Sequence, residues 1–249
     1  MSAELALDRT PPRVVAILVA SFTGFLAGQL LASLLESLGA GLAHFPGGLS
    51  ALARLDAPPW WANALGLIGL WIGFSGAILY AYGPGGLRTL PDQWRLRRGD
   101  VLYLVLGPVL QVAIDLAYRP FHLKNLGRPV HHLFDGSSGV SFVLIAVMTG
   151  LLAPFFEEWF FRGVIVRALS EGLETRSKRT AQVIAVLGSA ALFGAAHGEP
   201  TQFVGLFALG VVLALLVVRT RRLTPSIVTH VSFNGAALAA LIVQRAGHA

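Results

Sequence analysis

Two adjacent glutamates, Glu157 and Glu158, lie with Arg162 in the middle of an apolar stretch, "GLLAPFFEEWFFRGVIVRAL". An ionisable side chain at membrane depth costs about 2.5–3.5 kcal/mol on insertion scales, so it usually faces the bundle interior and has a partner. Glu158 and Arg162 are four residues apart and share a helix face, which predicts an ion pair that neutralises two buried charges. Glu157 is rotated by about 100° and has no basic residue at that spacing. Its carboxylate is the candidate for proton transfer.

A histidine ends a second apolar stretch. Phe193 and His197 are four residues apart in "FGAAH" and share a helix face, so Phe193 is expected to line the site. Glu157 and His197 each lie about 20 residues from the centre of the connection between their segments, which would place them level in an antiparallel helical hairpin. A carboxylate level with an imidazole can hold and deprotonate a water molecule. The sequence therefore predicts that Glu157 and His197 act together.

The last apolar stretch carries a similar pair, His230 and Asn234 in "HVSFN". Histidine and asparagine in membrane helices also serve as ordinary interhelical hydrogen-bonding groups, so this pair alone indicates little. His230 lies about 12 Å into its segment from Arg222. Helix tilt, or an extension of the fourth and fifth helices into the cytoplasm, would be needed to bring it level with Glu157.

The elements that must position these residues are membrane helices. The 249 residues are 55% hydrophobic and only 13% charged, about half the charge density of soluble domains. A span needs about 20 mostly apolar residues, and the sequence predicts an all-α polytopic helix bundle. The seven expected spans are 14–36, 61–83, 101–118, 140–168, 181–197, 202–218 and 225–243.

The chain is interpreted as one integral membrane domain in two regions. Residues 1–139 would hold the N-terminal spans and a polar surface segment, 119–139, forming a loop or a short amphipathic helix. Residues 140–243 would hold the catalytic core helices. The sequence contains no cysteine, which excludes disulfides, thiolate metal sites and cysteine nucleophiles.

The basic residues predict the orientation. With a cytoplasmic N-terminus, thirteen of the 19 Lys and Arg residues fall on that side and five on the other, with Arg162 inside a span. This bias favours N-terminus in and C-terminus out. It also explains the net charge of +6 without nucleic acid, which is not expected as a partner. We expect a bacterial plasma membrane protein with the lipid bilayer as its setting.

The three groups, "EEWFFR", "FGAAH" and "HVSFN", in this order on successive helices resemble the CPBP family. That family comprises the type II CAAX prenyl endopeptidases and bacteriocin-processing, Abi-like proteins. The similarity covers about residues 140–240. It implies that Glu157 and His197 activate the attacking water, and that His230 and Asn234 stabilise the oxyanion or bind a metal. It also implies that the ion pair of Glu158 and Arg162 shapes the site.

The cofactor follows from the same residues. Glu157, His197 and His230 could form a catalytic zinc site with an open position. The H-E-x-x-H helix of many zinc proteases is missing from the sequence. A metal-free site is therefore favoured, with zinc as the alternative.

The expected activity is that of an intramembrane endopeptidase that hydrolyses a peptide bond near the cytoplasmic face. Its substrate would be a peptide or membrane protein, with prenylated substrates among the candidates. The alternatives are a non-catalytic membrane immunity or scaffold protein and a proton-coupled transporter. Transporters commonly repeat their broken helices in both halves, and here the polar groups lie in the second half.

Overall fold

In the computed structural model the chain is helical, and the structure describes residues 11–86, 93–122, 126–172 and 177–247. Within those residues there is no strand. The helical segments long and apolar enough to cross a membrane are Arg13–Leu42, Trp60–Gly83, Arg98–Phe121, Gly139–Gly172, Lys178–Ala196, Phe203–Thr220 and Thr224–Ala246. These are the seven expected spans with slightly different ends, and the first continues furthest beyond its predicted end. The predicted all-α polytopic bundle is confirmed.

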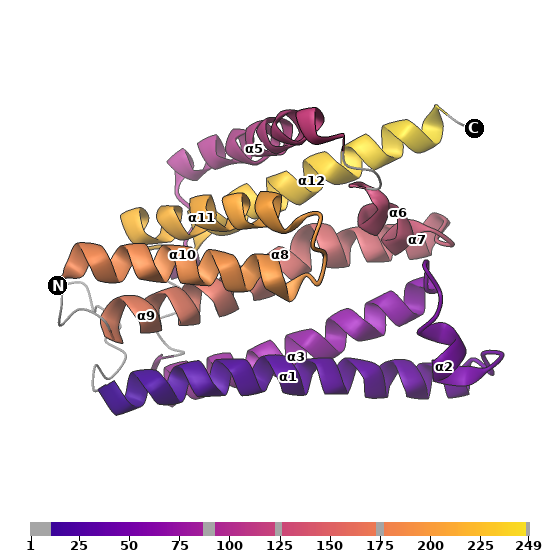
Figure 1. Cartoon of the computed structure of the whole chain (residues 1–249), viewed down its shortest axis with the longest axis horizontal. Helices are drawn as coiled ribbons and strands as arrows, with labels where there is room; N and C mark the ends of the chain where they lie inside the picture. The colour runs from indigo at the N-terminus through magenta and orange to yellow at the C-terminus, as the bar shows by residue number, and fades with distance from the viewer. Residues whose placement is uncertain (1–10, 87–92, 123–125, 173–176, 248–249) are drawn as a thin grey trace.

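The first two spans form a hairpin that packs through small residues. α1 (Pro11–Leu42) lies beside α3 (Trp60–Gly86), and the short α2 (Gly48–Leu52) belongs to their connection (Figure 1). A Cβ atom on Gly73 would overlap the carbonyl oxygen of Gly24. Backbones can approach this closely only where a side chain is missing, as in many contacts between membrane helices.

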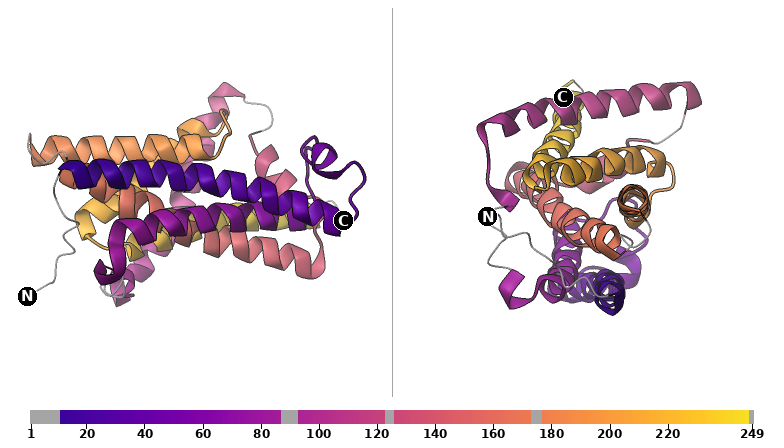
Figure 2. Two further views of the ribbon diagram at one scale, coloured as in Figure 1. Left: turned by 90° about the horizontal axis from the view of Figure 1, so that it is seen from below. Right: turned by 90° about the vertical axis from the view of Figure 1, so that its left-hand side faces the viewer.

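The third span packs on the last one. α5 (Tyr103–Tyr118) follows the 3-10 turn η2 (Arg98–Leu102) and lies against α12 (Thr224–Ala246). The two helices approach closely at Gly107, where a Cβ atom would overlap the backbone of Phe233. Figure 2 shows α5 at one edge of the bundle, on the opposite side from α1 and α3.

The polar segment 119–139 holds two short helical turns, η3 (Arg119–Phe121) and α6 (Arg128–Phe134). The Asn63 side chain on α3 donates a hydrogen bond of 3.2 Å to the carbonyl of Leu133, which ties α6 to the first hairpin. The expected loop or short helix is therefore a docked element of the bundle.

The fourth span is continuous but changes helix type along its length. It consists of α7 (Gly139–Val147), η4 (Met148–Leu152), α8 (Ala153–Glu157), η5 (Glu158–Val166) and α9 (Arg167–Gly172). η4 and η5 are π-helical, a geometry that often marks functional sites. The two glutamates lie at the junction of α8 and η5, so the helix widens at the residues that the sequence singled out.

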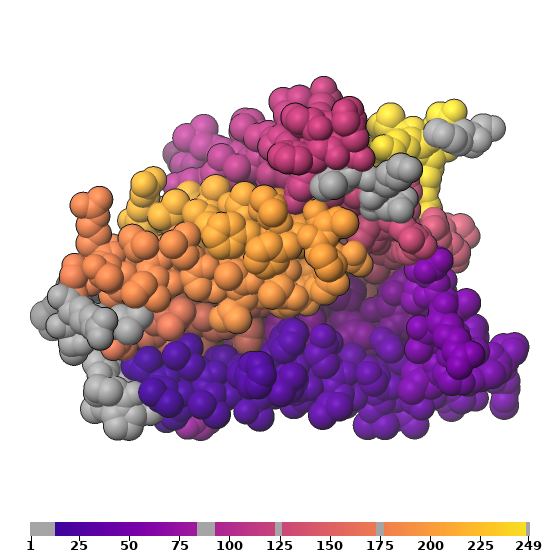
Figure 3. Space-filling model, in the orientation of Figure 1, coloured from indigo at the N-terminus to yellow at the C-terminus, as the bar shows by residue number. Residues whose placement is uncertain are grey.

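The fifth and sixth spans, α10 (Lys178–Ala196) and α11 (Phe203–Thr220), form a second hairpin. Figure 3 shows them on one face of the molecule, between α5 and α1. Beneath them the aromatic rings of Phe74 and Phe160 stack with centroids 4.1 Å apart, and Phe161 meets Phe193 edge to face. The core therefore joins side chains from both sequence regions.

One end of the bundle gathers most of the described basic residues, and we call it the basic end. It is formed by the starts of α1, η2, α10 and α12 and by the ends of α9 and α11 (left in Figure 1). Arg222 donates hydrogen bonds to Asp100, the shorter of them 2.5 Å, and to the carbonyl of Arg95. Four residues counted for the orientation lie outside the described residues: Arg9, Arg88, Lys124 and Arg176.

Candidate active site

Glu158 is the centre of a buried polar network. Its side chain is fully buried, and its Oε1 accepts hydrogen bonds from Arg162 Nη1 at 2.8 Å and from His230 Nδ1 at 2.9 Å. Its Oε2 accepts a hydrogen bond from Ser226 Oγ. Three donors, one of them a guanidinium, stabilise this carboxylate in its charged form away from water.

Arg162 is equally buried and fixes the network to its surroundings. Its Nη2 donates to the carbonyl of Gly210 on α11 at 3.2 Å. Its guanidinium carbon lies 4.4 Å from the centroid of the Phe193 ring, a cation–π contact. The same ring meets His197 and His230 edge to face, at 4.8 and 5.5 Å between centroids. Phe193 therefore contacts the arginine and both imidazoles with one ring.

Glu157 has a different environment from its neighbour. Its side chain is 15% exposed where that of Glu158 is fully buried. Its Oε2 lies 3.7 Å from Nε2 of His230. Because His230 also contacts Glu158 through Nδ1, its imidazole stands between the two carboxylates. The Glu157 carboxylate is therefore directed at Nε2 of His230, whereas Nδ1 of the same ring belongs to the buried network.

His197 ends its helix, as the sequence indicated. It caps the end of α10, and its Nδ1 donates to the carbonyl of Phe193 at 2.8 Å, which leaves Nε2 as its free nitrogen. The imidazole that approaches Glu157 most closely in the described structure is that of His230. His197 and Glu157 line the same cavity, and their joint action on water stays a prediction.

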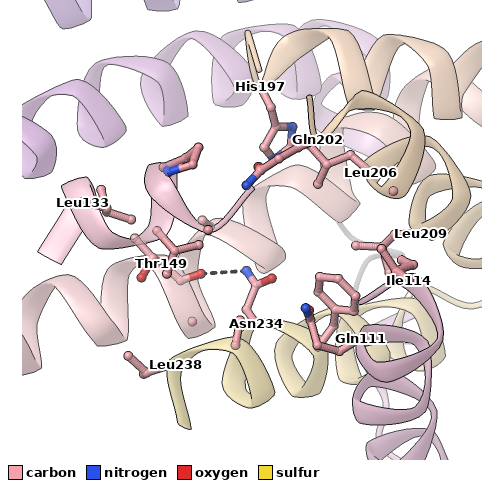
Figure 4. A pocket seen from close by; sticks show the side chains of 18 of the residues that line it. Gln111, Ile114, Leu133, Thr149, His197, Gln202, Leu206, Leu209, Asn234 and Leu238 are labelled. Atoms are coloured by element: carbon pink, nitrogen blue, oxygen red, sulfur yellow. Dashed lines mark hydrogen bonds between the residues drawn. The ribbon is translucent and has the colours of Figure 1, made fainter. Parts of the chain in front are cut away.

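Asn234 lies one helical turn beyond His230. Its Nδ2 donates to the carbonyl of Thr149 at 3.0 Å, and Thr149 lies in η4 (Figure 4). The amide nitrogen carries a second hydrogen that this bond does not use. Asn234 can therefore hold η4 in place and still donate a hydrogen bond into the cavity.

The four predicted catalytic residues, Glu157, His197, His230 and Asn234, line one cavity of about 410 Å³. Most of its other walls are apolar and come from α5, α6, η4, α11 and α12. Figure 4 shows His197 and Gln202 at one side of this space and Asn234 at another. A cavity of this size with few polar groups is typical of a small binding site.

The cavity runs from the end of the bundle opposite the basic end to the middle of the membrane spans. Tyr118 at the end of α5, Gly127 next to α6 and Gln202 before α11 line it at that opposite end. Glu157 lines it from the middle of the fourth span, and His230 lines it six residues from the start of α12, at the basic end. The expected cytoplasmic N-terminus and the expected cleavage near the cytoplasmic face therefore both stay predictions.

The comparisons with known proteins concern the same helices. A family model described as type II CAAX prenyl endopeptidase Rce1-like matches residues 139–236. This segment is similar to that family, and we call it the Rce1-like segment. No curated protein and no solved structure gives a match to the chain.

The Rce1-like segment contains all four candidate catalytic residues and the Glu158–Arg162 pair, so the resemblance seen in the motifs is confirmed. The family supports endopeptidase as the class of activity, a peptide as the class of substrate and the membrane as the setting. The walls contributed by α5 and α6 lie before the Rce1-like segment.

The fit of a metal ion to this site is poor. Within the described residues, no group of three or more His, Cys, Asp or Glu side chains is placed to hold a metal ion. Glu157, His197 and His230, the expected ligands, share the cavity, but only the first and last approach within 4 Å. The alternative of a zinc site therefore lacks a gathered set of ligands here.

Three polar residues at the site were not predicted from the sequence. Ser226 bonds to Glu158, and it lies four residues before His230 on the same helix face. Gln111 and Asp115 line the cavity from α5, again four residues apart. The signal for each was the same spacing that identified the other groups, but these side chains lie outside the recognisable motifs.

Proposed function

We propose that this protein is an intramembrane endopeptidase in which Glu157 and His230 activate the attacking water. The observation that supports the proposal is the 3.7 Å approach of Glu157 Oε2 to His230 Nε2 at the wall of the cavity. Both atoms could contact one water molecule on the cavity side. Glu158 stands behind His230 and fixes the direction of its ring.

The roles of the two glutamates follow from their partners. In the proposed reaction, Glu157 accepts a proton from water as the water oxygen bonds to the scissile carbonyl carbon. The same carboxyl group then gives the proton to the departing amine, and the carbon–nitrogen bond breaks. Glu158 remains a carboxylate, because Arg162, Ser226 and His230 all donate to it.

The oxyanion that forms on the carbonyl oxygen needs donors in the same cavity. Asn234 has a free N–H, and His197 has a free Nε2 that donates when protonated. A donor aimed at a developing oxyanion is worth about 3–4 kcal/mol in soluble proteases. We assign His197 and Asn234 to this task, which moves His197 from water activation and His230 into it.

The side of the membrane on which cleavage occurs depends on the orientation. The basic end favours a cytoplasmic N-terminus. Glu157 lies in the middle of its span and His230 lies six residues from the start of α12 at the basic end, so we propose cleavage nearer the cytoplasmic face. Because the sequence has no cysteine, Ser177→Cys and Thr201→Cys report the two ends without background. In intact cells an impermeant thiol reagent should label only Thr201→Cys, and labelling of only Ser177→Cys would reverse the orientation and move the proposed cleavage to the non-cytoplasmic side.

The chemistry is proposed to be metal-free. A strong chelator should leave cleavage unchanged, and the purified protein should lack stoichiometric zinc. Loss of activity with chelator and its recovery with added zinc would instead make Glu157, His197 and His230 ligands.

The activity itself is tested with purified protein in detergent and a pool of membrane-segment peptides, with and without a prenylated cysteine. Wild type should cleave at least one peptide, and Glu157→Gln should lower the rate by about 10²–10⁴-fold, the usual contribution of a general base. Glu36→Gln is the matched control, because Glu36 is a partly buried carboxylate in another span, beside Gly66. Cleavage that survives in Glu157→Gln, or no cleavage by wild type, would contradict the proposal.

A further inference from the structure

α5 has two different faces. Its exposed apolar residues follow the helical period and would face lipid: Val105, Val109, Val112 and Leu116. The residues on its other face line the cavity: Gln111, Ile114, Asp115 and Tyr118. Asp115 is exposed at this cavity within a membrane span, where ionisable residues are rare and usually functional.

Gln111 holds Asp115 in position. Its Nε2 donates to Asp115 Oδ1 at 3.2 Å, one turn along the helix. The Oε1 of the same amide is buried and has no hydrogen-bond partner in the described part of the chain. The pair therefore presents the Asp115 carboxylate, an acceptor-only group, toward a ligand that brings donors.

The ionisable groups of the cavity are two carboxylates and two imidazoles. The carboxylates are Glu157 and Asp115, the imidazoles are His197 and His230, and none of the lining residues is lysine or arginine. With no permanent positive charge beside its carboxylates, such a lining favours a cation. Asp115 lies on α5 and Glu157 on the fourth span, so binding and bond cleavage would use different walls.

We propose that Asp115, positioned by Gln111, is a specificity determinant that binds a lysine or arginine side chain of the peptide substrate. The inference rests on the proposed endopeptidase function and adds the substrate class. The contact is a charge-assisted hydrogen bond to an exposed carboxylate at the edge of a cavity with mostly apolar walls. α5 lies outside the Rce1-like segment, so this recognition belongs to the N-terminal part of the chain.

The test measures binding without cleavage. Fluorescent apolar peptides that differ only in one central Lys, Gln or Glu are titrated against purified Glu157→Gln protein in detergent. The Lys peptide should bind about tenfold more tightly than the Gln peptide. Adding Asp115→Asn should abolish the difference, and adding Asp115→Lys should favour the Glu peptide. Asp56→Asn, which changes a carboxylate outside the cavity, should leave the order unchanged.

The outcomes separate this inference from the function on which it rests. Equal or undetectable binding of the Lys and Gln peptides, or a Lys preference that survives Asp115→Asn, overturns the inference. If the Lys preference depends on Asp115 but wild type cleaves no peptide, the inference on recognition stands and the proposed endopeptidase function is wrong. Where wild type cleaves the Lys peptide, Asp115→Asn should raise KM about tenfold with little change in kcat, whereas damage to folding would lower kcat as well.

Discussion

The hairpin of α1 and α3 and the site around η5 and α12 solve the same problem in opposite ways. In the hairpin, glycines bring two backbones into contact, and its close-packed positions are small residues such as Gly24, Gly28 and Gly73. Around η5, the buried ion pair of Glu158 and Arg162 forms within one helix, and His230 on α12 donates to the same glutamate. Apolar packing is enough to associate membrane helices. Burying charged groups costs more free energy than packing apolar ones. We therefore expect the charged groups around η5 and α12 to have a chemical role.

The largest structural effect is expected at the buried arginine. Arg162→Ala leaves Glu158 fully buried without its cation, and breaking such a pair typically costs about 3–5 kcal/mol. Thermal unfolding in mild detergent should show a large loss of stability, with a low yield of folded protein. Arg128→Ala breaks the exposed pair with Asp56 and should cost no more than about 1 kcal/mol. Similar stability of the two variants would show that the buried network is not structural.

The hairpin should respond to size alone. Gly73→Ala introduces a Cβ that overlaps Gly24, and overpacking of this kind costs about 1–3 kcal/mol. Gly76→Ala is the matched control, because a Cβ there meets no atom within 4 Å. The loss of stability should come without a loss of turnover per folded molecule. A fall in turnover at constant stability would couple the hairpin to the site and weaken the contrast between the regions.

Two buried serines test the positioning of the site by smaller effects. Ser226→Ala removes a donor to the Glu158 carboxylate, worth about 1.5–3 kcal/mol for a hydrogen bond to a charged group. Ser189→Ala removes a donor to the carbonyl of Phe161, worth about 0.5–1.5 kcal/mol. Turnover should fall only in Ser226→Ala, because only that serine touches the carboxylate that orients His230. Equal turnover in both variants would argue against such a positioning role.

Local patterns in the sequence predict the membrane spans and the ion pair within the fourth span. Hydropathy predicts all seven spans, because membrane helices are long and uniformly apolar. The four-residue spacing predicts the salt bridge of Glu158 with Arg162, which forms within one helix.

Contacts between helices were harder to predict. The place of His230 between the two glutamates depends on how α12 crosses the fourth span, and counting residues from a loop assigned the contact to His197. The π-helical widening at η5 leaves no clear mark in the sequence. Ser226 and Asp115 carry polar groups at helical spacing, but their targets lie on other helices.

The central claim is that adjacent glutamates have separate tasks, and it is tested most directly by measuring Glu157→Gln and Glu158→Gln side by side. Each purified variant is assayed for thermal stability and for cleavage of a peptide that wild type cleaves. We predict that Glu157→Gln keeps wild-type stability and loses about 10²–10⁴-fold in rate. Glu158→Gln should lose stability and rate together, because it removes the charge that Arg162 and His230 share. Near-normal cleavage by Glu157→Gln, or the same loss of stability in both variants, would contradict the account.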